Sequence, residues 1–77
     1  METHETLDLR GLKCPLPALL AKRALSRAAP GTTFRVIADD PMARIDIPHM
    51  CRTEGFDVLA EERSGEETRL TLRRPAV

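Results

Sequence analysis

Cys14-Pro15-Leu16-Pro17 stands where one hydrophobic pattern gives way to another. The preceding residues 6–10 alternate between polar and apolar side chains, which is the period of a half-buried strand. From residue 16 to residue 28, apolar side chains recur at steps of three and four, which is the spacing of one helix face. The sequence therefore predicts a strand over residues 6–10 and a helix over residues 15–28, with the cysteine between them.

The two prolines indicate how this helix begins. Pro15 suits the first helical position, because its fixed φ matches a helix and its missing N–H would have no intrahelical partner. Cys14 is then expected to be the N-cap. Pro17 has no amide hydrogen, so the Leu16 amide is the donor expected to lie nearest to the Cys14 sulfur.

The charges expected around Cys14 favour a thiolate. The positive end of the helix dipole stabilises an anion, and the positive charges of Arg10 and Lys13 are expected to stabilise the thiolate further. We therefore expect the pKa of Cys14 to lie below the value of about 8.5 of a free thiol. A small buried residue at a helix start is the alternative for a cysteine in this position, and the local residues alone leave both open.

Composition limits the classes of partner. The 77 residues suffice for a single domain over residues 1–77, with a small core and an ordered part of about residues 6–74. Twelve Lys and Arg balance 12 Asp and Glu, so no net charge draws the molecule to nucleic acid. Trp and Tyr are absent, which removes the usual stacking platform for single strands. We expect a protein partner and no direct binding of nucleic acid.

The N-terminal sequence indicates the compartment. Its first five residues are polar and acidic, without the cationic start and apolar segment of a secretory signal. Around the motif, the longest stretch without charge is residues 14–21, which is too short to cross a bilayer. We expect a cytoplasmic protein without membrane partners, in a reducing environment that keeps a thiol available.

The rest of the chain predicts one more strand, one more helix and two final strands, over residues 32–38, 41–54, 56–62 and 68–73. Asp40 is expected to cap the second helix and Gly55 to end it, and Pro48 is expected to cause a kink or short break near Ile47. Met42 is expected on its apolar side.

The connections between these elements predict the fold class. A strand–helix–strand unit favours a parallel pair, and the Ser64-Gly65 turn between alternating runs favours an antiparallel hairpin. Alternation within the strands buries one sheet face only, so both helices should pack on that face. The predicted fold is an α/β two-layer sandwich of order βαβαββ with a mixed four-stranded sheet.

The remaining cysteine and the histidines do not form a second site. Cys51 lies one turn after Ile47 on an apolar stripe, which predicts a buried, inert thiol. Its alternative role is as a resolving partner of Cys14, which requires α-carbons within about 7 Å. His4 is expected in a mobile tail and His49 at the surface. Because these residues lack metal-ligand spacing, we expect no metal site and no cofactor.

The outer side of the first helix carries a basic run. Its members are Lys22, Arg23, Ser26 and Arg27. They form either a solvated helix face or a docking surface for an acidic partner or tRNA, and the sequence leaves both open.

Three segments together resemble the TusA/SirA-type sulfur carrier family. They are residues 7–17 with the C-P-x-P motif, residues 38–41 (Ala-Asp-Asp-Pro) and residues 46–48 (Asp-Ile-Pro). The resemblance covers residues 7–73, and the motif is specific where it follows a short strand and opens a helix. It implies the same two-layer sandwich of a mixed four-stranded sheet and two helices.

The resemblance also implies an activity, a sulfurtransferase whose Cys14 carries sulfane sulfur as a persulfide. It implies a cysteine desulfurase or rhodanese-type enzyme as donor and a protein as acceptor. Outlets of the family are tRNA thiolation, molybdenum cofactor synthesis and sulfur oxidation. Members that serve tRNA thiolation often have an acidic residue between the two prolines, whereas Leu16 stands here.

Sulfur relay by thiolate attack on a sulfur–sulfur bond suits these residues. Arg10 and Lys13 are candidates for supporting the anion or docking a partner, although both could equally be ordinary surface charges. Pro15, Leu16 and Pro17, at the start of the helix, are further candidates for the same support or docking. Two other hypotheses compete, namely a binding or regulatory module in which Cys14 is structural, and a thiol–disulfide oxidoreductase that also uses Cys51.

Overall fold

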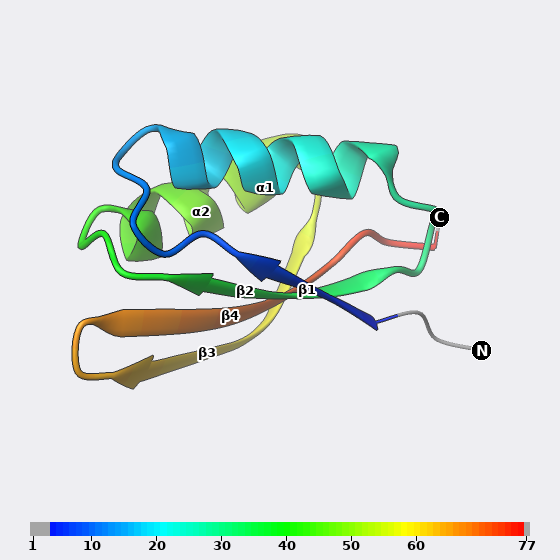
Figure 1. Ribbon diagram of the computed structural model, residues 1–77. Coiled ribbons are helices and arrows are strands. Elements are labelled where there is room, and N and C mark those ends of the chain that lie inside the picture. The colour runs from blue at the N-terminus through cyan, green and yellow to red at the C-terminus, as the bar shows by residue number, and fades with distance from the viewer. Residues whose placement is uncertain (1–3, 77) are drawn as a thin grey trace.

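The computed structural model describes residues 4–76, in which helices alternate with strands as the sequence predicts. The elements are β1 (His4–Asp8), α1 (Leu16–Arg27), β2 (Thr33–Ala38), α2 (Ala43–Glu54), β3 (Asp57–Ser64) and β4 (Glu67–Arg73). Both helices lie on the same face of the sheet (Figure 1). The predicted two-layer α/β sandwich is confirmed. Within the described residues, neither helix has the length and apolar character needed to cross a membrane.

The sheet is mixed, with the strand order β1-β2-β4-β3. β1 and β2 pair in parallel, whereas β4 pairs antiparallel with both β2 and β3. The parallel pair places the carboxyl ends of β1 and β2 at the same edge of the sheet. The loops that follow these two strands therefore meet there, and this edge carries the candidate site.

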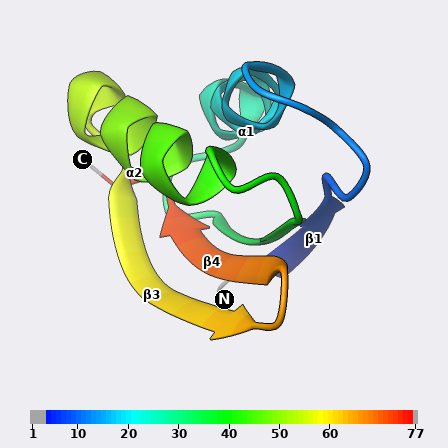
Figure 2. The ribbon, with the colours of Figure 1, turned by 90° about the vertical axis from the view of Figure 1, so that its left-hand side faces the viewer.

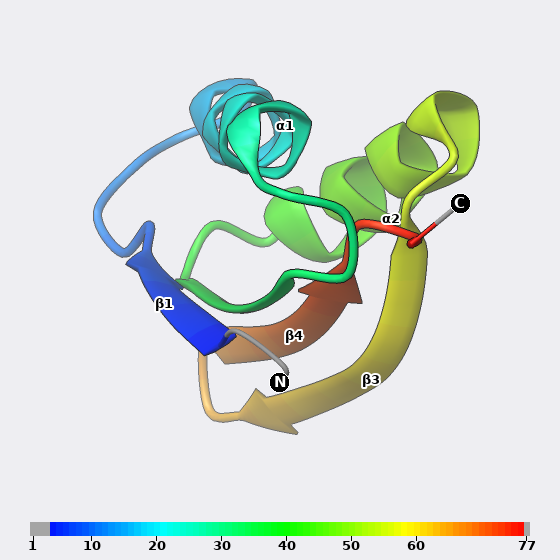
Figure 3. The same cartoon turned by 90° about the vertical axis from the view of Figure 1, so that its right-hand side faces the viewer.

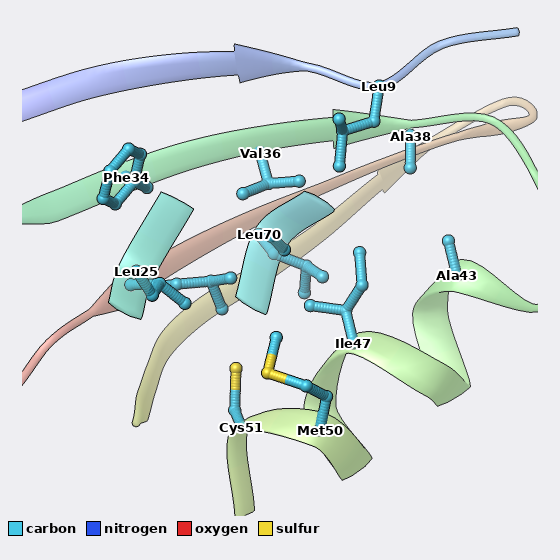
Figure 4. Close-up of a cluster of buried hydrophobic side chains, with 12 residues drawn as sticks. Leu9, Leu25, Phe34, Val36, Ala38, Ala43, Ile47, Met50, Cys51 and Leu70 are labelled. Atoms are coloured by element: carbon cyan, nitrogen blue, oxygen red, sulfur yellow. The ribbon is translucent and has the colours of Figure 1, made fainter. Parts of the chain in front are cut away.

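The core lies between the helices and the inner face of the sheet (Figure 4). Alternate residues of the central strands supply one side of it, and the inward faces of the helices supply the other. Its fully buried members include Leu25, Val36, Ile47, Cys51, Leu70 and Leu72. The period-two and period-3.6 patterns in the sequence thus mark the residues that pack here.

The edges of several elements differ from the sequence prediction. β1 covers His4–Asp8 in place of residues 6–10, so His4 begins a strand and does not lie in a mobile tail. Leu9 still donates its N–H to the Ile37 carbonyl at 2.7 Å and is buried, which extends the pairing beyond the strand. β3 reaches Ser64 because the ladder continues as far as the pair Ser64 and Glu67.

The structure of α2 corrects three expectations, two at its start and one at Pro48. Its N-cap is Met42, and Asp40 makes no side-chain cap because its carboxylate binds the loop before α1. Met42 is exposed and does not join the apolar side. The helix continues through Pro48 without a break, and it ends at Gly55, as predicted, in the left-handed conformation that glycine tolerates.

The C-terminal end of α1, which faces the viewer in Figure 3, is held by Arg74. Its Nη1 donates to the carbonyl oxygens of Ser26 at 2.7 Å and Ala28 at 2.8 Å. A cation in this position satisfies carbonyls that have no helical partner and complements the helix dipole. The segment that follows β4 therefore links the C-terminal end of α1 to the sheet.

Arg74→Ala should lower the free energy of unfolding by about 1–2 kcal/mol, because it removes charge-assisted hydrogen bonds at a helix end. Urea unfolding monitored by circular dichroism measures this change. The matched control is Arg23→Ala, at an exposed arginine of α1 that makes no side-chain bond within residues 4–76. Equal stabilities of the two variants would contradict the capping role.

Candidate functional site

Cys14 is exposed on the loop between β1 and α1. This loop lies beside the loop between β2 and α2, at the end of the molecule that faces the viewer in Figure 2. The parallel pairing of β1 and β2 is the reason, because both loops leave the sheet at the same edge. The C-P-x-P and Asp-Asp-Pro segments, far apart in the sequence, thus form one site.

Two neighbouring aspartates hold the loop that carries the cysteine. Asp39 accepts the N–H of Gly11 at 2.9 Å through Oδ1, and Asp40 accepts the N–H of Cys14 at 2.7 Å through Oδ2. Asp40 is only 9% exposed, so water competes little for its carboxylate. The backbone on both sides of the loop is therefore fixed by side chains of the β2–α2 connection.

The thiol of Cys14 faces a third aspartate. Its Sγ donates to Oδ2 of Asp46 at 3.0 Å, and Asp46 is half-buried in the first turn of α2. This hydrogen bond, followed by desolvation and by the charges of Asp46 and Asp40, raises the pKa of Cys14 above its ordinary value. The prediction of a lowered pKa is therefore wrong, because the nearest charges are negative.

The start of α1 also differs from the prediction, because the helix does not supply the expected hydrogen bond to the Cys14 sulfur. Pro15 is the N-cap and makes no side-chain cap, so Cys14 lies one residue outside the helix. The Leu16 amide donates to the Lys13 carbonyl at 2.8 Å and does not bind the sulfur. Pro17 is buried in the core. The helix end thus supplies no hydrogen bond to the thiol.

The two predicted cations are placed differently. Arg10 pairs with Asp8 at 2.8 Å and with Glu67 at 3.5 Å, so two carboxylates, and not the sulfur, take up its charge. This arginine lowers the pKa of Asp8 to about 2. Lys13 is exposed and lines a hollow that Cys14 does not line. Neither cation binds the Cys14 sulfur.

A groove of about 470 Å³ extends from Cys14 between α1 and α2. It is lined by Cys14, Pro15, Ala18, Leu19, Lys22, Asp46, His49, Met50, Thr53 and Glu54. Lys22 and Glu54 pair at 3.4 Å. The sequence reasoning gave no site role to Asp46 or His49. The only available signal was the resemblance, in which Asp46 belongs to a family segment.

Comparison with known proteins identifies the family. A family model described as "Sulfurtransferase TusA" matches residues 5–74 of this chain. The chain belongs to the TusA family. A SirA-like protein from Desulfitobacterium hafniense has a similar structure, with a TM-score of 0.77 and 26% sequence identity. The match covers 92% of this chain and 97% of that one, so the predicted family and fold are confirmed.

The second cysteine of this TusA-family chain does not reach the groove. Cys51 is fully buried and points into the core beside Met50 (Figure 4). Its burial raises the pKa of the thiol to about 11. Both cysteines are free. The expectation of a buried thiol is confirmed, and an exchange role for Cys51 would require the core to open. His49, as expected, is exposed.

Asp46→Asn should lower the pKa of Cys14, because a neutral amide in place of the carboxylate no longer disfavours the thiolate. The pH profile of the alkylation rate, measured with iodoacetamide, should shift to lower pH. Glu54→Gln is the control, since it removes a carboxylate at the Lys22 end of the same groove and should leave the profile in place. A profile that stays or moves to higher pH in Asp46→Asn would contradict this account.

Proposed function

We propose that this protein carries sulfane sulfur as a persulfide on Cys14 and relays it from one protein partner to another. The observation that carries the proposal is an exposed thiol at the mouth of an open groove, in a chain of the TusA family. The loop around the thiol is fixed by Asp39 and Asp40, so the sulfur stays presented to a visiting partner.

The transfer step exchanges one sulfur–sulfur bond for another. The Cys14 thiol loses its proton, and the thiolate attacks the outer sulfur of a persulfide on the donor. The donor's sulfur–sulfur bond breaks, a new one forms on Cys14, and the donor cysteine leaves as a thiolate that takes up a proton. The step needs no external oxidant or reductant. In the second transfer, an acceptor thiolate attacks the outer sulfur on Cys14, and Cys14 leaves as a thiolate that takes up a proton.

Asp46 is suited to two roles in this exchange. Its carboxylate already accepts the Cys14 hydrogen at 3.0 Å, so it is placed to receive the proton when the sulfur attacks. After loading, the persulfide is an anion at neutral pH and lies near Asp46 and Asp40. Like charges disfavour that anion, which promotes transfer to the next partner over storage.

The surface around the thiol supports protein partners. Leu16 and Leu19, on the first turns of α1, are 46% and 53% exposed, and Ile45, next to Asp46, is 55% exposed. Exposed aliphatic residues beside a reactive group are typical of an interaction surface. A cysteine desulfurase or rhodanese-type donor and a protein acceptor in the cytoplasm are the partners of this proposal. Leu16 favours an acceptor outside tRNA thiolation.

Incubation with a cysteine desulfurase and L-cysteine should add one sulfur atom to the protein, detected by intact-mass spectrometry. Cys14→Ser should abolish this uptake. Cys51→Ser is the matched control and should retain uptake to within about twofold, because the Cys51 thiol is fully buried and a donor cannot reach it.

Two outcomes would contradict the carrier. Failure of uptake with both desulfurase and rhodanese donors would favour a binding module in which Cys14 is structural. Loss of transfer in a folded Cys51→Ser variant would favour a dithiol mechanism.

A further inference from the structure

A second hollow, of about 420 Å³, is lined by Lys13, the residue before Cys14, and not by Cys14 itself. Three separate segments supply cations to it: Lys13 from the β1–α1 loop, Arg44 from the first turn of α2 and Arg63 from the end of β3. The three segments surround the same end of the molecule (Figure 2). We refer to this hollow as the three-cation pocket.

The charges of the three-cation pocket are available to a ligand. Lys13, Arg44 and Arg63 are exposed, and none of them makes a side-chain hydrogen bond or ion pair within residues 4–76. Some arginines elsewhere are engaged, since Arg73 pairs with Asp57 at 2.9 Å and Arg74 binds helix carbonyls, whereas Arg23 of α1 also has no partner within residues 4–76, and what sets these three cations apart is that they line one hollow. Three unpaired cations that converge on one hollow indicate a site for negative charge.

The pocket also contains two carboxylates, which restrict what it can bind. Asp39 is occupied by the Gly11 amide, and Glu66 lies in the hairpin turn next to Arg63 and Gly65. A compact dianion placed centrally would meet both of them. Carboxylates spaced along a peptide can approach the cations separately, and so an acidic peptide segment fits this charge pattern better than a phosphate.

The position of the pocket relates it to the thiol. Lys13 lines the three-cation pocket and its neighbour Cys14 lines the groove between the helices, so one loop forms a wall of both. A partner that binds the pocket therefore contacts the loop that carries the sulfur. The chain carries no net charge and no stacking aromatics at this site, which disfavours nucleic acid as the occupant.

We propose that the three-cation pocket seats an acidic segment of the protein that exchanges sulfur with Cys14. This inference rests on the proposed function for the identity of the partner, and the pocket itself is tested without sulfur transfer. It also differs from docking on the basic outer face of α1, which uses Lys22, Arg23 and Arg27.

The first experiment is an NMR titration of the ¹⁵N-labelled protein with a capped tri-glutamate peptide, with tri-glutamine as the neutral control. Amide shifts should cluster at residues 13, 44 and 63–66. Arg44→Gln and Arg63→Gln should each weaken binding by about two- to fivefold, the value of one exposed ion pair. Glu66→Gln should tighten it, and Arg23→Gln should leave it unchanged.

Parallel titrations with inorganic phosphate and with a short single-stranded RNA complete the test. Four results would overturn the proposal. They are the absence of shifts, shifts centred on the outer face of α1, tighter binding of inorganic phosphate at the same amides, and tighter binding of a short single-stranded RNA. The last two would identify a simple anion site and a nucleic-acid site respectively.

The second experiment measures loading of Cys14 against the concentration of a cysteine desulfurase that loads the parent protein. Arg44→Gln should raise the half-saturating concentration about two- to fivefold, with the effect on this value and not on the maximal rate. Arg23→Gln is the matched control. Unchanged half-saturation in Arg44→Gln, with the parent loading normally, would overturn the pocket while leaving the carrier function intact.

Discussion

The hydrogen bond from the Cys14 amide to the Asp40 carboxylate is the contact on which the site depends. It joins residues 26 positions apart at 2.7 Å, and its acceptor is nearly buried. The pairing of β1 with β2 brings the two loops together, and this bond then fixes their relative position. Without it, the nearest remaining contact between the two loops would be the bond from the Gly11 amide to Asp39, three residues before the thiol.

The electrostatics of the site suit a carrier better than an enzyme that needs a permanently ionised thiol. Asp46 and Asp40 both oppose negative charge on the sulfur. The cysteine is therefore held as a hydrogen-bond donor to Asp46, and under the proposed function the same charges would disfavour a persulfide anion on Cys14. A site that strongly stabilised the sulfur anion would accept sulfur readily but release it slowly. A relay must both accept and release sulfur readily.

The sequence predicted the fold well because hydrophobic periodicity is a local signal. Alternation at Phe34, Val36, Leu70 and Leu72 correctly located the central strands and their buried face. The electrostatics of the site were predicted wrongly because they depend on contacts between residues far apart in the sequence, which a local signal does not contain. Local capping rules assigned Asp40 to its own helix, whereas it binds Cys14, and no pattern in the sequence indicates that Asp46 reaches a thiol 32 residues away. Long-range hydrogen bonds decided both cases.

Amide hydrogen exchange of Cys14, measured by NMR, tests the role of Asp40 most directly. We expect this amide to be protected in the parent protein, and we expect Asp40→Ala to remove its protection while the amides of β2 and β4 keep theirs. Exchange of the Cys14 amide at the rate of an unprotected peptide in the folded parent protein would contradict the account.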